Sequence, residues 1–168
     1  MYVKTEHLEL RPIEQEDFAN LVELLTDDTV KQTYLLPDFS DGEAARKMAE
    51  RIGKISQDAG RFVAGIYLEG QLLGLMNETE VSGSTIEVGY ALLPCFHNRG
   101  YCTEALRGAI DYLFAQGFAE VRAGAFEDNL ASIRVMEKSG MKKIDHSDEV
   151  DYRGKTHRCV YYAIGNPL

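Results

Sequence analysis

The sequence contains no tryptophan, only 3 cysteines and 4 prolines, and no long uninterrupted apolar run. A membrane-spanning helix needs about 20 consecutive apolar residues, so no transmembrane helix is predicted. The first ten residues, MYVKTEHLEL, lack the apolar core of a secretory signal peptide. The cysteines, at positions 95, 102 and 159, are odd in number and lack metal-ligand spacing. They predict reduced thiols in a cytoplasmic protein, and the 4 scattered histidines add no metal site.

Positive charge is also scarce, because 18 basic side chains face 27 acidic ones and the net charge is −9. The excess lies mostly in residues 1–60, which carry 13 acidic and 7 basic side chains. Nucleic-acid binding requires the opposite sign, so no nucleic-acid partner is expected. An acidic N-terminal part suits a cationic acceptor, although surface acidity that serves only solubility explains it equally well.

Periodicity and turn signals indicate one α/β domain over residues 1–168, with a mixed, mostly antiparallel sheet of seven strands and about four helices. Ser40 and Glu43 form a capping box at the start of the second helix. Tight turns at 69–70 and 82–84 join three consecutive antiparallel strands. The expected strands cover residues 7–11, 61–68, 71–80, 86–93, 120–126 and two segments of 141–164. The expected helices cover residues 14–25, 102–114 and 130–139, and a further helix runs from the capping box to just before Gly60.

A tight turn, His97-Asn98-Arg99-Gly100-Tyr101-Cys102, joins the strand over 86–93 to the amphipathic helix over 102–114. The first amides of a helix have no intrahelical partner and lie at the positive end of its dipole. A turn that presents several of them together is suited to phosphate or pyrophosphate. An ordinary strand-to-helix connection without a ligand has the same composition, so the turn alone leaves both interpretations open.

The turn resembles the acyl-CoA-binding motif Q/R-x-x-G-x-G/A of the GNAT superfamily of N-acetyltransferases, with His97, Gly100 and Cys102 at the three defined positions. The turn departs from this motif at two positions, where His97 replaces Gln or Arg and Cys102 replaces Gly or Ala. The run from Tyr101 to Ala105 is similar to G-Y-x-T-E-A, and residues 129–140 resemble the N-x-x-S-x-x-x-x-E-K-x-G block. The first is common in the branch that acetylates ribosomal-protein N-termini, and the second is typical of the ribosomal-protein and related small-molecule acetyltransferase branch. The resemblance covers nearly the whole chain and implies the GNAT fold, with a splayed central pair of parallel strands.

The resemblance also implies the site residues for acetyl-CoA. The residues expected to bind the cofactor are Leu92 and Leu93 through their backbone, the turn residues His97, Asn98, Arg99, Gly100, Tyr101, Cys102 and Thr103, and Asn129. Ser132 is the expected general acid, because Met136 stands where many GNAT proteins carry a tyrosine. Glu87 is the expected general base, with Glu78 or a water relay as alternatives. Tyr90, Tyr161 and Tyr162 are assigned to the core or to the pocket wall.

The expected activity is direct transfer of an acetyl group from acetyl-CoA to a primary amine, either a protein N-terminal α-amine or a small molecule. The alternative is a catalytically idle acyl-CoA-binding sensor or interaction module, which the loss of a tyrosine at position 136 would favour. Residues 26–39 are expected to line the acceptor pocket or to join the core. A monomer or a homodimer is expected.

Overall fold

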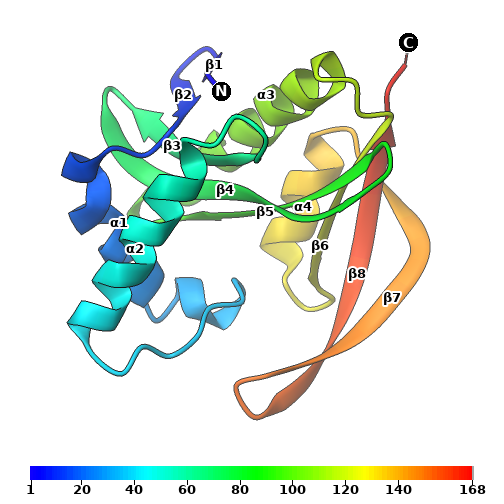
Figure 1. Cartoon of the computed structure of the whole chain (residues 1–168). Coiled ribbons are helices and arrows are strands. Elements are labelled where there is room, and N and C mark those ends of the chain that lie inside the picture. The colour runs from blue at the N-terminus through cyan, green and yellow to red at the C-terminus, as the bar shows by residue number, and fades with distance from the viewer. Residues whose placement is uncertain (168) are drawn as a thin grey trace.

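The computed structural model describes residues 1–167 and contains an open sheet with the strand order β1-β2-β3-β4-β5-β6-β8-β7 (Figure 1). Every neighbouring pair is antiparallel except β5 and β6, which run parallel. The strands are β1 (Val3–Lys4), β2 (Leu8–Arg11), β3 (Val63–Leu68), β4 (Gln71–Ser82), β5 (Thr85–Leu92), β6 (Glu120–Phe126), β7 (Lys142–Tyr152) and β8 (Lys155–Gly165). The sheet thus has one strand more than the seven expected, because β1 is only two residues long and leaves no periodic pattern.

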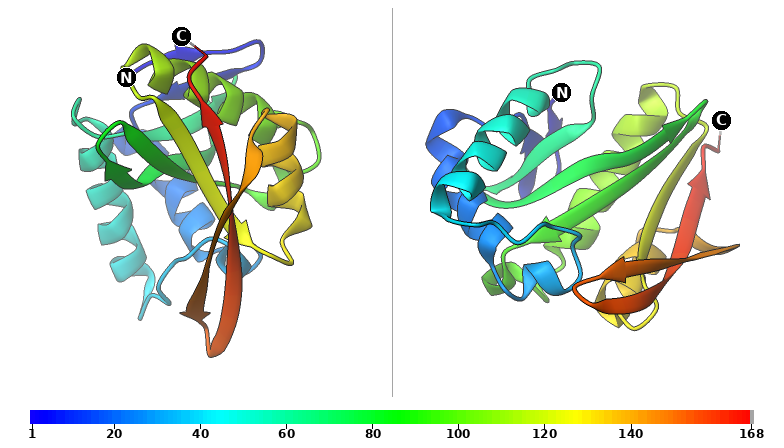
Figure 2. Two further views of the ribbon diagram at one scale, coloured as in Figure 1. Left: turned by 90° about the vertical axis from the view of Figure 1, so that its right-hand side faces the viewer. Right: turned by 60° about the horizontal axis from the view of Figure 1, so that its bottom comes forward.

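Four α-helices cover the two faces of this sheet, as expected. They are α1 (Phe18–Thr26), α2 (Gly42–Ser56), α3 (Tyr101–Ala115) and α4 (Leu130–Lys138), and short 3-10 turns occur at η1 (Gln15–Asp17), η2 (Val30–Gln32) and η3 (Pro94–Phe96). Helices α1 and α2 pack on one face and α3 and α4 on the other (Figure 2). No helix within residues 1–167 is long and apolar enough to cross a membrane.

The start of α2 differs from the sequence expectation. Asp41, not Ser40, is the N-cap residue, and its Oδ1 accepts a hydrogen bond from the amide of Ala44 at 2.8 Å. Both side chains are good caps, but a helix that begins at Gly42 places Ala44 at the third helical position. The predicted capping box from Ser40 to Glu43 is therefore wrong.

Each face of the sheet has its own apolar core. On the α3 and α4 face, Ile86, Val88 and Leu92 of β5 are buried, whereas Ala91 and its neighbour Leu93 are buried on the α1 and α2 face. This alternation follows from the period of two in a strand. Strand β5 is therefore covered on both sides and is held firmly at the centre of the molecule.

Strands β5 and β6 pair only over three residues, from Thr85↔Glu120 to Glu87↔Arg122, and then separate. A register shift in β4 between Glu78 and Glu80 lies opposite the last of these pairs. β6 instead continues its pairing with β8 to Phe126. The sheet therefore opens between β5 and β6 (Figure 2), which confirms the expected splayed parallel pair.

Candidate active site

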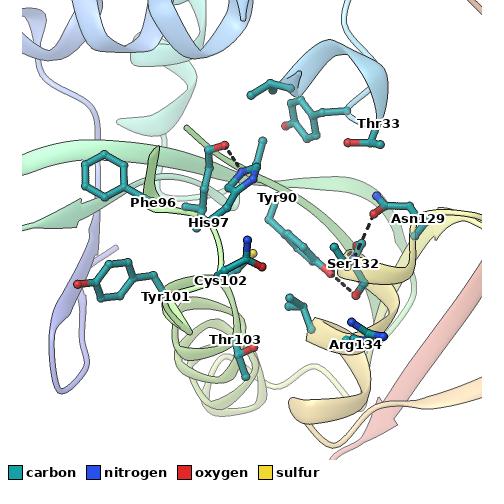
Figure 3. A pocket seen from close by; sticks show the side chains of 18 of the residues that line it. Thr33, Tyr90, Phe96, His97, Tyr101, Cys102, Thr103, Asn129, Ser132 and Arg134 are labelled. Atoms are coloured by element: carbon teal, nitrogen blue, oxygen red, sulfur yellow. Dashed lines mark hydrogen bonds between the residues drawn. The ribbon is translucent and has the colours of Figure 1, made fainter. Parts of the chain in front are cut away.

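A cavity of about 550 Å³ lies where β5 and β6 separate. Its walls come from the end of β5, the turn before α3, the first residues of α4, β6 at Gly124 and Ala125, and residues 29–34. Segments far apart in the sequence thus meet around one space (Figure 3).

The turn before α3 presents a row of unpaired main-chain amides to this cavity. Asn98 and Gly100 adopt left-handed conformations, with φ of 59° and 83°, and α3 begins at the next residue. None of the amides from Asn98 to Thr103 has an acceptor among residues 1–167, whereas the His97 amide donates to the Pro94 carbonyl at 3.1 Å. Alternating backbone conformations at a helix N-terminus form a concave anion site. The turn therefore fits a pyrophosphate, with the amides of Asn98 and of residues 100–103, which line the cavity, as donors.

Cys102 lies inside this turn and lines the cavity. Burial raises the pKa of its thiol to about 12, so the thiol is neutral at physiological pH. A neutral thiol is a poor nucleophile. The residue is thus suited to its position by its small size and not by reactivity.

The main chain of β5 offers further donors to the gap. The Leu93 amide donates to the Leu73 carbonyl at 2.9 Å, and hydrogen-bonded pairs alternate along an antiparallel ladder. The amides of Tyr90 and Leu92 therefore point away from β4, toward the space that β6 has left. The Leu92 carbonyl lies 2.9 Å from Nε2 of His97, so this ring nitrogen must carry the proton. His97 acts as a brace between β5 and the turn, and the Leu92 amide faces the cavity.

Two hydroxyl groups meet on the α4 side of the cavity. The Ser132 Oγ lies 2.9 Å from the Tyr90 hydroxyl, and the Ser132 amide donates to Oδ1 of Asn129, the N-cap of α4, at 3.2 Å (Figure 3). Burial is the main reason why the pKa of Tyr90 lies well above its ordinary value. Met136 is fully buried in the core and does not line the cavity. Ser132 and Tyr90 are therefore the hydroxyl donors of this wall.

Neither candidate base lines the cavity itself. Glu87 lies on β5 just before the strands separate, and one of its carboxylate oxygens accepts from the Thr79 hydroxyl at 2.8 Å. Glu78 is occupied by Arg61 and by the amide of Phe62, so it serves the entry to β3. Of the two, Glu87 is the freer carboxylate.

Two carboxylates, those of Glu87 and Asp148, lie near Tyr161 of β8, and Nε2 of His146 lies 3.2 Å from Asp148. The Tyr161 ring packs where a side chain on Gly124 would lie, and its hydroxyl donates to Asp148 at 3.1 Å. Burial, this hydrogen bond, and the nearby charge of Glu87 all raise the pKa of Tyr161. The charges of Asp148 and Glu87 thus both act on the Tyr161 hydroxyl.

The opposite wall is formed by residues 29–34, which the sequence suggested as acceptor pocket or core. Tyr34 lines the cavity, and its hydroxyl donates to Oδ1 of Asn77 on β4. A hydroxyl from the β7–β8 hairpin, that of Tyr152, donates to the Lys31 carbonyl at 2.7 Å and accepts from the Leu36 amide at 3.2 Å. Arg153 in the same hairpin pairs with Asp38 at 2.7 Å. These contacts, called here the Tyr152 latch, fasten the hairpin to residues 31–38.

The structure brings together most of the residues singled out from the sequence. Those that line the cavity are Leu92, His97, Asn98, Gly100, Tyr101, Cys102, Thr103, Asn129 and Ser132. Glu87, Leu93 and Arg99 lie outside its lining, and the Leu93 amide is already used within the sheet. The sequence placed Tyr90 in the core or pocket wall and Tyr34 in the segment expected to line the acceptor pocket or join the core, but it predicted no hydrogen-bond partner for either hydroxyl.

Comparison with known proteins defines the class. Residues 7–142 match the family model described as "Acetyltransferase (GNAT) domain", so the chain belongs to the GNAT acetyltransferase family. It is 26% identical over 145 residues to the uncharacterized N-acetyltransferase YnaD of Bacillus subtilis (strain 168), covering 85% of this chain and 84% of that protein. It is 27% identical to the uncharacterized N-acetyltransferase p20 of Bacillus licheniformis, covering 83% of this chain and 81% of that protein.

Solved structures agree. A GNAT-family acetyltransferase from Bacillus anthracis superposes with a TM-score of 0.84 at 26% identity, over 98% of both chains. RimL, a ribosomal L7/L12 alpha-N-protein acetyltransferase solved with coenzyme A, gives 0.85 at 18% identity over 98% of both chains, which shows a shared fold. The protein is therefore an acyltransferase of the N-acetyltransferase type, with acetyl-CoA as its acetyl donor.

Proposed function

We propose that this protein transfers the acetyl group of acetyl-CoA directly to a primary amine, carried by a protein N-terminus or by a small molecule. The observation that supports this best is the run of unpaired amides from Asn98 to Thr103, because every residue of this run except Arg99 lines the same cavity as Ser132. A donor held by its pyrophosphate at the turn can then extend its thioester along the gap beside β5. A pantetheine chain can pair there with the free main-chain groups as an added strand would.

The reaction needs an oxyanion donor, and the Leu92 amide is the proposed one. It faces the gap and has no partner on β6, since β5 and β6 no longer pair beyond Glu87. An amide fixed in a sheet does not have to reorient as negative charge develops on the carbonyl oxygen. Removal of one such donor commonly lowers the rate by about 10²–10³.

Glu87 is the proposed general base, acting through water because its carboxylate lies outside the cavity lining. The alternative Glu78 is less suited, since Arg61 and the Phe62 amide already occupy it. The carboxylates of Glu87 and Asp148, which both act on Tyr161, also attract an ammonium group, the resting form of an amine acceptor.

Ser132 is the proposed proton donor to the leaving sulfur. The amine nitrogen forms a bond to the carbonyl carbon, the carbon–sulfur bond breaks, and sulfur takes the electron pair. The proton that the nitrogen gives up balances the proton that the sulfur receives. General acid catalysis contributes about 10²–10⁴ to such steps.

The Tyr152 latch bears on the acceptor class. It fastens the β7–β8 hairpin to residues 31–38, next to the cavity wall over residues 29–34, so an amine on a flexible segment or a small molecule fits better than one on a broad folded surface. Both a flexible peptide N-terminus and a small molecule meet this condition. We place the reaction in the cytoplasm, because the three cysteines are free thiols.

The test is release of free CoA from acetyl-CoA in the presence of peptides with free N-termini, aminoglycosides and simple diamines. The proposal expects acetylated product with at least one class. It also expects Ser132→Ala to lower kcat by about 10² or more, with little change in CoA affinity. Tight acetyl-CoA binding without transfer to any amine would instead support the idle acyl-CoA-binding sensor.

A further inference from the structure

We propose that Tyr90 is a positioning residue for Ser132: its phenol holds the serine oxygen from β5, so that the serine hydrogen is directed to the sulfur of the acetyl donor. The inference rests on the proposed function. It gives a role to a side chain that sequence reasoning assigned to the core or pocket wall.

The two residues form a bridge across the gap. Tyr90 lies on β5 and Ser132 on α4, 42 residues further along the chain, and both line the cavity. The Tyr90 hydroxyl is 2.9 Å from the Ser132 Oγ and 3.4 Å from the Ser132 carbonyl oxygen (Figure 3). The phenol therefore contacts the serine at two points and fixes the direction of approach.

The direction of the hydrogen bond follows from acidity. A phenol is a stronger acid than an aliphatic hydroxyl, and of its two possible acceptors the Ser132 Oγ at 2.9 Å is nearer than the Ser132 carbonyl oxygen at 3.4 Å, so we assign the single phenol hydrogen to Oγ. The Ser132 amide is already bound to Oδ1 of Asn129, and within residues 1–167 the serine hydroxyl has no partner other than Tyr90. When Tyr90 donates, the hydrogen of the Ser132 hydroxyl is left free for the sulfur of a donor in the cavity that Ser132 lines.

The surroundings keep Tyr90 in the donating form. Burial and the neighbouring Cys102 raise the pKa of the phenol, and this outweighs the opposite effect of its bond to Ser132. The phenol thus remains protonated throughout the range in which an amine acceptor reacts.

The chemistry balances without any added reagent. As the carbon–sulfur bond breaks, the electron pair moves to sulfur, and the Ser132 hydroxyl donates a hydrogen bond to the developing thiolate. Ser132 passes its proton to sulfur and regains one from solvent, and Glu87 releases to solvent the proton that it takes from the nitrogen through water. Tyr90 keeps its own proton. Tyr90 therefore acts through Ser132 and not on the substrate.

A double-mutant cycle tests the proposal, with kcat, the KM for acetyl-CoA and CoA affinity measured for each variant. Tyr90→Phe is expected to lower kcat by about tenfold, the usual value of one such hydrogen bond, and to leave KM within about twofold. The pair Tyr90→Phe with Ser132→Ala is expected to be no slower than Ser132→Ala alone. Tyr112→Phe, which removes a phenol from α3 outside the cavity, is the matched control and should retain wild-type kcat.

An unchanged kcat in folded Tyr90→Phe, or losses that multiply in the double variant, would overturn the role of Tyr90. Should Tyr90→Phe not fold, Ser132→Thr replaces it: threonine keeps the hydroxyl and is expected to stay within about threefold of wild type. Equal activity of Ser132→Thr and Ser132→Ala would then reject the proposal. A wild-type protein that releases no CoA with any amine overturns the proposed function itself, and the role of Tyr90 falls with it.

Discussion

Gly100 offers a sharp test of the amide site. Its φ of 83° lies in the left-handed region, and a Cβ added there would meet nothing within 4 Å. Gly100→Ala therefore introduces conformational strain without a steric clash. A left-handed conformation costs a residue with a Cβ about 1–2 kcal/mol.

The turn can relieve this strain by leaving the left-handed region, which turns the amides from Asn98 to Thr103 away from their common direction. Coenzyme A binding must then restore the strained form. An energy of 1–2 kcal/mol corresponds to a factor of about 5–30 in an equilibrium constant, so the Kd for CoA is expected to rise by about that factor.

Gly117 supplies a matched control. It follows α3, has a φ of 96°, and a Cβ there would also meet nothing within 4 Å. Both substitutions are expected to lower Tm by about 2–4 °C for each kcal/mol of strain, since the domain is of ordinary size. Only Gly100→Ala should weaken CoA binding in calorimetry. Equal CoA affinity in the two alanine variants would refute the role given to the turn.

Three further predictions concern the acceptor side and the N-terminal segment. Tyr152→Phe removes the hydroxyl of the Tyr152 latch. It is expected to raise the KM for the acceptor severalfold and to speed amide hydrogen exchange in residues 31–38, with CoA affinity unchanged. Unchanged hydrogen exchange in residues 31–38 would argue against the latch. Glu87→Gln is expected to lower kcat/KM at neutral pH by about tenfold or more. Glu80 is exposed and pairs with Glu87 across β4 and β5, so Glu80→Gln is the control and should leave kcat/KM unchanged. Equal effects of the two substitutions would assign the loss to surface charge alone. The hydrogen bond to Glu104 is the main reason why the pKa of His7 is raised in the folded protein. The stability that protonated His7 contributes is therefore complete below about pH 6.5 and is lost as pH rises through the higher folded-state pKa. His7→Gln should abolish that part of the Tm decrease between pH 6 and 8, and an identical pH profile of Tm in both proteins would contradict this linkage.

Local sequence signals correctly predicted a helix cap, a left-handed glycine and a tight turn, because each depends on residues close together in the chain. Asn129 caps α4, Gly140 adopts the left-handed conformation after it with a φ of 86°, and the turn at Glu69 and Gly70 joins β3 to β4, each as expected. In each case the determining interaction lies within a few residues, where side-chain caps and glycine have strong preferences.

The parts that the sequence did not predict depend on contacts between distant segments. The Tyr90 hydroxyl reaches Ser132 across 42 residues, and the Tyr152 hydroxyl reaches Leu36 across 116. No local pattern marks a tyrosine for such a partner. Glu87 was expected at the reacting centre but lies just before the strands part, because the point of separation depends on the pairing of β5 with β6.

The most direct test of the account is a crystal structure with coenzyme A bound. The account predicts diphosphate oxygens at about 3 Å from main-chain amides between Asn98 and Thr103, and the sulfur within reach of the Ser132 hydroxyl. A diphosphate bound away from this turn, or a sulfur on the far side of β5 from Ser132, would contradict it.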